Sequence, residues 1–418
     1  MHAVLDAILR RFVTIGRLTV WWPDGSRTTY GSDDEPQVAM RLRDTRTVRR
    51  LVLNPSLAAG EEYVEGRLVV EDGRLYDLLD VLLASRDDAP TAHPVMRLRE
   101  RLGALTRRLD QYNPAARSRR NVAHHYDLNG RLYSLFLDRD WQYSCAYFAT
   151  GDETLEEAQA AKKRHIAAKL CLDRPGLRVL DIGCGWGGMA LTLARDFGAH
   201  VTGVTLSQEQ LQAARARAVA EGLDDRVRFE LRDYRAVTEQ FDRIVSVGMF
   251  EHVGVGHFGE FFNTVARCLK RDGVALVHAI GRSDGPGGTN KWMQKYIFPG
   301  GYSPALSEVL PGIERSGLMT TDIEILRLHY AKTLRHWRRR FAANRDAITA
   351  LYDERFCRMF EFYLAASEIT FRRCGHLVWQ AQLAHDQTAV PLTRDYVAAA
   401  EAMRPVGQVA QAADPLGR

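Results

Sequence analysis

The sequence lacks the features of a membrane-spanning, secreted or metal-binding chain. No window approaches the roughly 18 consecutive apolar residues that a spanning helix needs. At the N-terminus, Arg10 and Arg11 interrupt the apolar run and no basic segment precedes it, so we interpret this stretch as an amphipathic helix and not a signal peptide. The six cysteines lie far apart without CxxC pairs, which argues against a zinc site and a disulfide framework. We therefore expect a protein of the reducing cytoplasm.

The length of the chain and its changes in composition predict two domains. A chain of 418 residues exceeds what one compact core normally organises. Residues up to about Leu83 contain short alternating runs, such as RLTVWW and GRLVV, between turn signals, which predicts a small strand-containing domain. A polar stretch and an arginine-rich helix follow, and that helix ends near Asn113 and Pro114. We place the boundary there, with an N-terminal domain over 1–112 and a larger domain over 113–418.

Positive charge is concentrated locally although the net charge is only +5. The segment from Met96 to Arg120 holds eight arginines against Glu100 and Asp110. Such a strip suits the phosphate groups of lipid headgroups or of nucleic acid, and a solvated helix face explains it equally well. A second strip, LRHWRRRF from Leu334, leaves the same alternatives open.

From Leu177 onwards strands and helices alternate, which predicts an α/β domain with a doubly wound, mostly parallel sheet. The predicted strands are 178–183, 200–206, 227–231, 241–248 and 273–280. The predicted helices include 188–198 and 207–222, the second of them capped by Ser207.

The turn DIGCGWGG joins the first of these strands to a helix. Its glycines allow a close approach of the backbone to a ligand, and the helix N-terminus presents free N–H groups. Gly183, Gly185 and Gly188 also satisfy G-x-G-x-x-G, so a dinucleotide site must be weighed. Two features favour S-adenosylmethionine instead. Asp181 completes the D-x-G-x-G-x-G pattern of class I methyltransferases, and after the second strand Thr205 and Gln210 stand where a nicotinamide site needs a ribose-binding acid.

Several further motifs resemble the cyclopropane-fatty-acyl-phospholipid synthases and the related mycolic acid cyclopropane synthases. They are NVAHHYDL, QYSCAYF, LDIGCGWGG, VTLSQEQ, MFEHVG, HAIG and HYAKTLRHW, and the resemblance runs from about Asn121 to Gln380. It implies a class I, Rossmann-like methyltransferase domain over 113–418. The domain over 1–112, with its basic linker, looks like the lipid-associated N-terminal domain of the longer bacterial members.

The resemblance also assigns roles to individual residues. It implies that S-adenosylmethionine contacts these positions: Tyr143, Ser144, Asp181, Gly183, Gly185, Gly187, Thr205, Gln210, Asp233 and Tyr234. It implies a bicarbonate ion held by another set: Cys145, Glu251, His278, the backbone at Ile280, and Tyr330. One departure concerns a late helix, where family members often have a cysteine and this chain has Ser367, which excludes a covalent cysteine mechanism at that point.

The reaction that the resemblance implies is cyclopropane formation on an unsaturated fatty-acyl chain of a membrane phospholipid. Attack of the double bond on the sulfonium methyl group leaves a carbocation, and ring closure needs a base close to the new methyl group. Six aromatic side chains are candidates for a dry wall around the cation, although ordinary core packing is the better explanation for any single one: Tyr147, Phe148, Phe250, Trp292, Tyr296 and Phe298.

Three other functions are alternatives to cyclopropane formation. A methyl-branched or methylene fatty acid would arise from the same cation, and the complete set of bicarbonate ligands favours ring closure. A nucleic-acid methyltransferase acting on exocyclic amines often carries an Asn/Asp-Pro-Pro-aromatic motif, and GMFEHVG stands at that place. A lipid-binding module with a vestigial cofactor site conflicts with the intact DIGCGWGG motif. The expected partners are a bilayer surface at the inner face of the membrane and unsaturated acyl chains, with no nucleic acid; a homodimer is left open.

Overall fold

The computed structural model describes residues 1–84 and 130–402, and its contacts divide the chain into two compact units. The first unit comprises Met1–Arg107, Gly288–Pro299 and Leu334–His376. The second unit comprises Arg108–Gly287, Gly300–Thr333 and Leu377–Arg418. The boundary at residue 112 and the arginine strip from Met96 to Arg120 lie outside the described residues, so both remain predictions. The sequence patterns did not reveal that two late segments group with the N-terminal region.

A seven-stranded sheet forms the centre of the second unit, in the order β10-β11-β9-β8-β5-β6-β7. Its central strands pair in parallel, and β10 runs antiparallel to β11. The strands are β5 (Arg178–Ile182), β6 (His200–Thr205), β7 (Val227–Leu231), β8 (Phe241–Val247), β9 (Leu269–Arg282), β10 (Met319–Leu326) and β11 (His376–Ala384). This arrangement confirms the predicted doubly wound, mostly parallel α/β domain.

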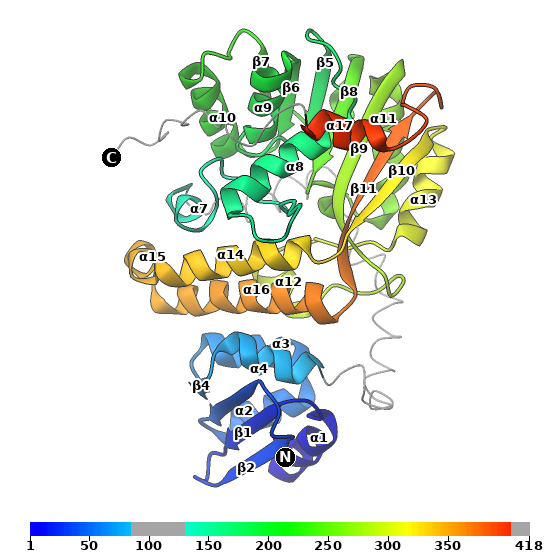
Figure 1. Ribbon diagram of the computed structural model, residues 1–418. Helices are drawn as coiled ribbons and strands as arrows, with labels where there is room; N and C mark the ends of the chain where they lie inside the picture. Colours follow the sequence, from blue (N-terminus) through cyan, green and yellow to red (C-terminus); the bar gives the residue numbers. More distant parts are fainter. Residues whose placement is uncertain (85–129, 403–418) are drawn as a thin grey trace. The chain divides into compact units, whose positions relative to one another are not determined.

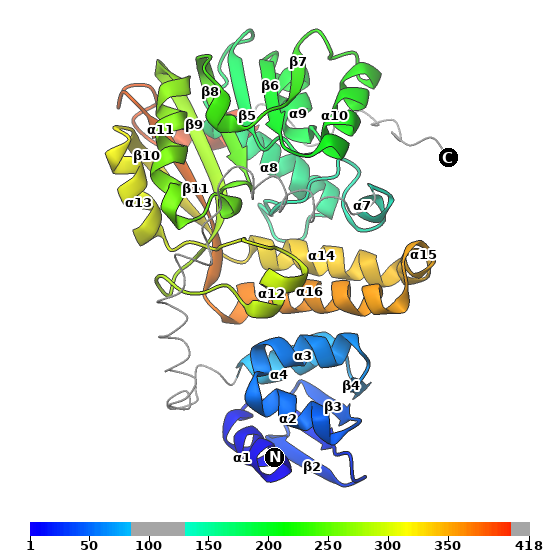
Figure 2. The same cartoon turned by 180° about the vertical axis from the view of Figure 1, so that it is seen from behind.

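Helices cover both faces of this sheet, as Figures 1 and 2 show from opposite sides. One face packs against α8 (Leu155–Lys169), α9 (Gly188–Phe197) and α10 (Gln208–Ala220). The other face packs against α11 (Phe258–Cys268) and α13 (Leu306–Arg315). The unit also contains α7 (Gly130–Phe136), α17 (Asp395–Ala402), η1 (Tyr234–Ala236), η2 (Phe250–His252) and η3 (Val255–His257).

Capping residues explain where two of these helices begin. The Ser207 hydroxyl accepts a hydrogen bond of 3.3 Å from the Gln210 N–H, which confirms Ser207 as the N-cap of α10. Helix α8 begins with a reciprocal pair, in which Thr154 Oγ1 accepts from the Glu157 N–H and Glu157 Oε2 accepts from the Thr154 N–H. Both caps fix helices that lead to the site described below.

A second, four-stranded sheet lies in the first unit, in the order β2-β1-β3-β4. Its elements are α1 (His2–Phe12), β1 (Arg17–Trp21), β2 (Arg27–Gly31), β3 (Gln37–Leu42), α2 (Thr45–Leu53), α3 (Pro55–Val64), β4 (Leu68–Asp72) and α4 (Leu75–Ala84). The alternating runs predicted β1 and β4, and α1 is the expected first helix. Helices α2 to α4 complete the core, although the alternation of short apolar runs gave no sign of them.

The late segments add helices to the first unit: α12 (Lys291–Tyr296), α15 (Arg345–Leu351), α16 (Glu354–Arg373) and most of α14 (His329–Ala343). Helices α14 and α16 lie side by side (Figures 1 and 2), and the Phe341 and Phe360 rings stack at 5.1 Å. The second arginine strip lies on α14, where Arg338 pairs with the buried Glu368 at 3.0 Å. Part of that strip is therefore structural. Within residues 1–84 and 130–402, no helix combines the length and the apolar character needed to cross a bilayer.

Candidate active site

The turn after β5 forms the floor of a cavity in the second unit. Gly183, Gly185 and Gly187 all have positive φ angles, of 81°, 54° and 85°. A Cβ atom at Gly187 would lie 2.7 Å from the Phe229 ring, and one at Gly183 would lie 2.8 Å from the Met249 side chain. Backbone conformation and close packing therefore both require glycine at these two positions.

Most of the residues predicted to bind the cofactor line this cavity. They are Tyr143, Ser144, Asp181, Gly183, Gly185, Thr205, Gln210 and Tyr234. Two predicted residues are not among those that line it. Gly187 lies against Phe229 and Ala214, and the Asp233 carboxylate caps η1 and pairs with Arg235 at 2.7 Å.

Asp181 provides the test of whether a cationic cofactor fits the cavity. The side chain is 1% exposed, and its Oδ2 atom has no hydrogen-bond partner among the described residues. Burial raises the pKa of Asp181 to about 7, against an opposing effect of Lys162. A buried carboxylate oxygen without a partner is costly unless a ligand supplies one. The ammonium group of S-adenosylmethionine has the charge and the donors that this oxygen lacks.

Thr205 and Gln210 lie at the end of β6 and at the start of α10. Thr205 Oγ1 donates to Gln210 Oε1 at 2.9 Å and accepts from the Ser207 N–H at 3.1 Å. Both residues also line the cavity. The structure thus brings together the two residues that replace the ribose-binding acid of a nicotinamide site.

Other residues of the cavity were missed from the sequence. They include Trp141, Gln142, Trp186, Met249, His252, Arg232 and Arg235. Trp141 has a φ angle of 55°, and its ring meets the Trp186 ring edge-on at 5.2 Å. The sequence gave no periodicity for these residues because they lie mainly in loops. The recognised motifs were the signal that could have found several of them, since QYSCAYF contains Gln142, LDIGCGWGG contains Trp186, and MFEHVG contains Met249 and His252.

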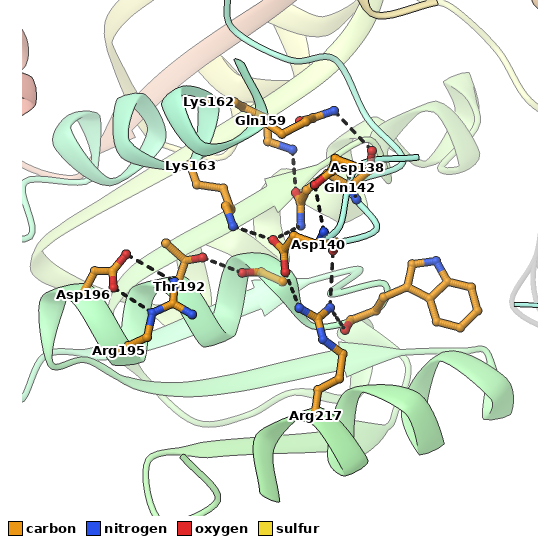
Figure 3. Close-up of polar contacts among 12 residues, drawn as sticks. Asp138, Asp140, Gln142, Gln159, Lys162, Lys163, Thr192, Arg195, Asp196 and Arg217 are labelled. Atoms are coloured by element: carbon orange, nitrogen blue, oxygen red, sulfur yellow. Dashed lines mark hydrogen bonds and ion pairs between the residues drawn. The ribbon is translucent and has the colours of Figure 1, made fainter. Parts of the chain in front are cut away.

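A buried ionic network anchors this loop (Figure 3). Lys162, on α8, donates to Gln142 Oε1 at 2.6 Å and to Ser144 Oγ at 2.9 Å. Asp140 pairs with both Lys163 and Arg217, and Arg217 also donates to the Trp186 carbonyl at 2.8 Å. The network therefore ties the loop both to α8 and to the glycine-rich turn.

The fourth glycine of the turn makes room for the same loop. A Cβ atom at Gly188 would lie 2.2 Å from Gln142 Nε2 and 2.5 Å from Asp140 Oδ2. The φ angle of Gly188 is not positive, so close approach and not backbone conformation requires this glycine.

Charges in the network offset one another. Burial lowers the pKa of Lys162 to about 8, although Asp138 and Asp140 act in the opposite direction. Burial would raise the pKa of Asp140, but Lys163 and Arg217 together hold it below its ordinary value. Because these charges lie largely out of solvent, removing one of them leaves its partner with an unbalanced charge, which destabilises the fold.

Glu251, His278 and Ile280 lie together at the end of the sheet. Val247, at the end of β8, is paired with His278 on β9, and Glu251 follows in η2. The Ile280 N–H donates to Glu251 Oε1 at 2.6 Å. Glu251 Oε2 is buried and has no hydrogen-bond partner among the described residues. Burial raises the pKa of Glu251 to about 7, against the opposing effect of the Ile280 N–H.

Cys145 and Tyr330 come from two segments that are joined by a hydrogen bond between a backbone N–H and a side-chain hydroxyl. Cys145 is buried, and burial raises the pKa of its thiol well above the ordinary value despite the positive charge of Lys162. The next N–H, of Ala146, donates to Thr333 Oγ1 at 3.0 Å. Thr333 lies one turn after Tyr330 on α14. All five residues of the predicted bicarbonate set thus belong to the second unit, and their roles stay predictions.

The aromatic candidates separate into different environments. Phe250 stacks on Phe258 at 4.6 Å within the core of the sheet, so core packing explains it. Tyr147 stacks between His165 at 4.1 Å and His329 at 5.1 Å. Phe148 also belongs to the second unit, whereas the other three candidates belong to the first: Trp292, Tyr296 and Phe298.

Comparison with known proteins places this arrangement in a family. The model of the mycolic acid cyclopropane synthetase family matches residues 114–381, and a domain of unknown function, DUF7884, matches residues 4–92. The chain is 39% identical to cyclopropane-fatty-acyl-phospholipid synthase of Escherichia coli, over 82% of this chain and 86% of that protein. It is 36% identical to a probable fatty acid methyltransferase of Pseudomonas putida, over 85% of this chain and 88% of that protein.

Solved structures agree with this assignment. The mycolic acid cyclopropane synthase CmaA1, crystallised with SAH and CTAB, is 35% identical with a TM-score of 0.61, over 66% of this chain and 99% of that one. SAH is S-adenosylhomocysteine, the product that S-adenosylmethionine leaves after methyl transfer, which agrees with the cavity around Asp181. The chain therefore belongs to the mycolic acid cyclopropane synthetase family and is an S-adenosylmethionine-dependent methyltransferase.

Proposed function

We propose that this enzyme converts the cis double bond of an unsaturated fatty-acyl chain in a membrane phospholipid into a cyclopropane ring. The observation that carries the proposal is the buried, unpartnered Glu251 Oε2 close to the end of the cofactor-binding sheet. The named relatives agree on the substrate class, since one is a cyclopropane-fatty-acyl-phospholipid synthase and another a probable fatty acid methyltransferase.

The residues of the cavity would bind and orient the two reactants. S-adenosylmethionine, when bound, supplies an electrophilic methyl group. Asp181 would hold its ammonium group, while Tyr143 and Ser144, whose hydroxyl accepts a hydrogen bond from Lys162, would border its reactive end. An alkene is a poor nucleophile, so the enzyme must hold it in line with the methyl group at close range. The positions that Lys162 and Arg217 fix in the loop would serve this alignment.

Glu251 and its neighbours would manage the proton that ring closure releases. Bicarbonate, when bound, would supply the base that accepts this proton. The Ile280 N–H occupies Glu251 Oε1, so Oε2 is the oxygen available to an anion. A carboxyl group with a pKa of about 7 can carry a proton at neutral pH and donate it in a hydrogen bond to that anion. Cys145, His278 and Tyr330 would complete the set, and the buried Cys145 would act as an uncharged thiol.

A second candidate function is the formation of a methyl-branched or methylene fatty acid. The similarity to a probable fatty acid methyltransferase over 85% of this chain favours it. Both functions share the carbocation and differ in which proton leaves. Ring closure requires a base next to the added methyl group, and the unpartnered Glu251 Oε2 supports such a base site.

Product analysis would separate these functions. Purified protein would be incubated with labelled S-adenosylmethionine and vesicles of unsaturated phospholipid, and the released fatty acids analysed by mass and NMR. We expect a gain of one CH₂ together with cyclopropane proton signals. A product with two further hydrogens would indicate a reduced methyl branch. The mass of one added CH₂ with olefinic signals would indicate a methylene product. Either result would refute ring closure.

We also propose that the enzyme acts as a peripheral protein at the inner face of the cytoplasmic membrane. The arginines between 97 and 120 would hold it against anionic phospholipid, and salt would weaken this attraction because charges are screened within roughly 8 Å at physiological ionic strength. Replacing Arg117, Arg119 and Arg120 by serine should lower activity on vesicles and the salt dependence, but not the affinity for S-adenosylmethionine. Undiminished vesicle activity at every salt concentration would remove this idea.

A further inference from the structure

His278 and Gln380 form a buried hydrogen bond between adjacent strands. Gln380 Nε2 lies 3.1 Å from His278 Nδ1, and the two side chains are 0% and 2% exposed, respectively. An amide nitrogen can only donate a hydrogen bond, so His278 Nδ1 must accept it and therefore carries no hydrogen. This contact defines the chemical state of the ring, and not only its orientation.

The surroundings of His278 keep the ring uncharged. Burial lowers the pKa of His278 well below its ordinary value. Positive or protonatable groups act in the same direction from α8 and from the start of α14: Lys162, Lys169, His165 and His329. On the side of β8, Glu251 bonds to the N–H of Ile280, two residues after His278. A neutral imidazole has one ring hydrogen, and with Nδ1 bare this hydrogen lies on Nε2.

The side-chain amides of Gln380 and Gln382 differ in how many of their hydrogen-bonding atoms have a partner. Gln382 lies two residues further along β11 and uses both ends of its amide. Its Oε1 accepts from Thr321 Oγ1 at 2.8 Å, and its Nε2 donates to the Tyr396 hydroxyl at 2.7 Å. Gln380 Oε1, by contrast, has no hydrogen-bond partner among the described residues. A buried amide that satisfies only its donor end costs free energy that an apolar side chain of similar size would avoid.

We propose that Gln380 is a positioning residue that keeps the single hydrogen of the His278 ring on Nε2, so that His278 presents a donor to an anion. The identity of that anion as bicarbonate rests on the proposed function. Without the Gln380 donor the neutral ring can place its hydrogen on either nitrogen, and with the hydrogen on Nδ1 the Nε2 lone pair would repel an anion. Gln380 thus acts through His278 and does not touch the reacting atoms.

Gln380→Glu reverses this constraint with almost no change in size. When the pair of Glu and His holds an extra proton, the ring keeps a hydrogen on Nε2, whichever of the two groups carries that proton. When the pair loses it, the carboxylate accepts from Nδ1–H and Nε2 becomes bare. Turnover of Gln380→Glu relative to the native enzyme should therefore fall as pH rises through the pKa of the pair. We expect a fall of roughly 10- to 100-fold, the usual effect of losing a hydrogen bond to a charged group.

Gln380→Met is the matched control because it removes the donor and adds no acceptor. Without either constraint, the neutral ring exists in both the Nδ1–H and the Nε2–H form, and an anion can bind the Nε2–H form. We therefore expect a severalfold loss of turnover, and the ratio of this turnover to that of the native enzyme should not vary with pH. A purely structural role would give the opposite order, because Glu can hydrogen-bond to the ring and Met cannot. An equal loss of activity in both variants at every pH would overturn the proposal.

The position of the hydrogen can be measured without turnover. NMR of the full-length protein with ¹⁵N-labelled histidine, free of S-adenosylmethionine and lipid, distinguishes protonated from bare ring nitrogens, and the signal absent from His278→Gln assigns the residue. We expect Nε2–H in the native protein and Nδ1–H in Gln380→Glu at high pH. Nδ1–H in the native protein, or no change in the variant, would overturn the proposal. If the NMR result is as expected but all three proteins turn over equally, the positioning role stands and the place of His278 in the proposed function is wrong.

Discussion

The cofactor cavity and the proposed base site lie in the same unit, but the chain builds them in different ways. The centre of the cavity is one continuous turn, from Asp181 to Gly188, where a strand meets a helix, and residues of other elements complete its lining. The base site takes single residues from separate elements: Cys145 from a loop, Glu251 from η2, His278 from β9, Tyr330 from α14 and Gln380 from β11. In both sites a buried carboxylate oxygen is left without a partner, on Asp181 and on Glu251. We propose that a cation pairs with the ionised Asp181 and that an anion accepts a hydrogen bond from the protonated Glu251.

The largest loss of activity is expected from a change at Glu251, in the proposed base site. Glu251→Gln retains the size of the side chain and the acceptor for the Ile280 N–H, but the new side chain can neither gain nor lose a proton. Product formation should fall by roughly 10² to 10⁴, the usual contribution of general acid–base catalysis, while binding of S-adenosylmethionine is retained. Turnover and calorimetric binding would be measured together. Glu314→Gln, at an exposed position of α13, is the control and should be fully active. A parallel loss of cofactor binding would assign Glu251 to the other site.

The network beneath the cofactor loop should dominate stability. Arg217→Met removes the donor to Asp140 Oδ1 and to the Trp186 carbonyl in a largely buried setting, and leaves Lys163 as the cation paired with Asp140. We expect the free energy of unfolding to decrease by about 3–5 kcal/mol, the usual result of breaking a buried ion pair. Urea denaturation would measure it. Arg226→Met, which removes an exposed pair with Asp225 at 3.9 Å, should change stability by no more than about 0.5 kcal/mol. Similar values for both variants would contradict the structural role of the network.

Asp181 should make the affinity for S-adenosylmethionine depend on pH. Its pKa is raised to about 7, and a bound cation favours the ionised form. The affinity for S-adenosylmethionine should therefore increase as pH rises through 7, by up to about tenfold per unit below the pKa, and level off above it. Asp181→Asn should remove this slope and weaken binding by roughly 10- to 100-fold near pH 8. An unchanged slope in the variant would show that another group titrates.

Gly188→Ala tests the close approach between the turn and the loop. The added methyl group would overlap Gln142 and Asp140, whereas a Cβ atom at Gly256 would meet nothing within 4 Å. We expect Gly188→Ala to decrease the free energy of unfolding by about 1–3 kcal/mol, the usual range for overpacking. The effect of Gly256→Ala should stay within about 0.5 kcal/mol. Thermal or urea unfolding of both variants would decide, and an unaffected Gly188→Ala would show that the loop adjusts freely.

The smallest effect is expected at Ser367, on α16 in the first unit. No enzyme-linked intermediate is needed, so Ser367→Ala should retain most of the activity on vesicles. A packing change of roughly 1–2 kcal/mol cannot explain a loss beyond about a hundredfold in a folded protein. A loss of that size would require a catalytic role for Ser367.

The same contrast explains what could be predicted from the sequence. The glycine turn, Ser207 and strands β5 to β9 were predictable because each is encoded by neighbouring residues. The Lys162 and Arg217 contacts were not, because each joins segments distant in the sequence and long polar side chains on helices usually face solvent. The grouping of 288–299 and 334–376 with the N-terminal region also depends on distant contacts. The base site was predicted only through family resemblance, because no local pattern distinguishes His278 from an ordinary buried histidine.

The dependence of turnover on bicarbonate tests the central claim most directly. Native enzyme and Glu251→Met, whose side chain cannot hydrogen-bond to the ion, would be assayed in degassed buffer, with and without added bicarbonate, at fixed pH and saturating S-adenosylmethionine. We expect removal of bicarbonate to slow the native enzyme strongly and to leave the variant nearly unchanged, because a site that no longer positions the ion gains little from it. Equal responses of the two proteins, or a native enzyme indifferent to bicarbonate, would contradict the claim that Glu251 holds the ion as the base for ring closure.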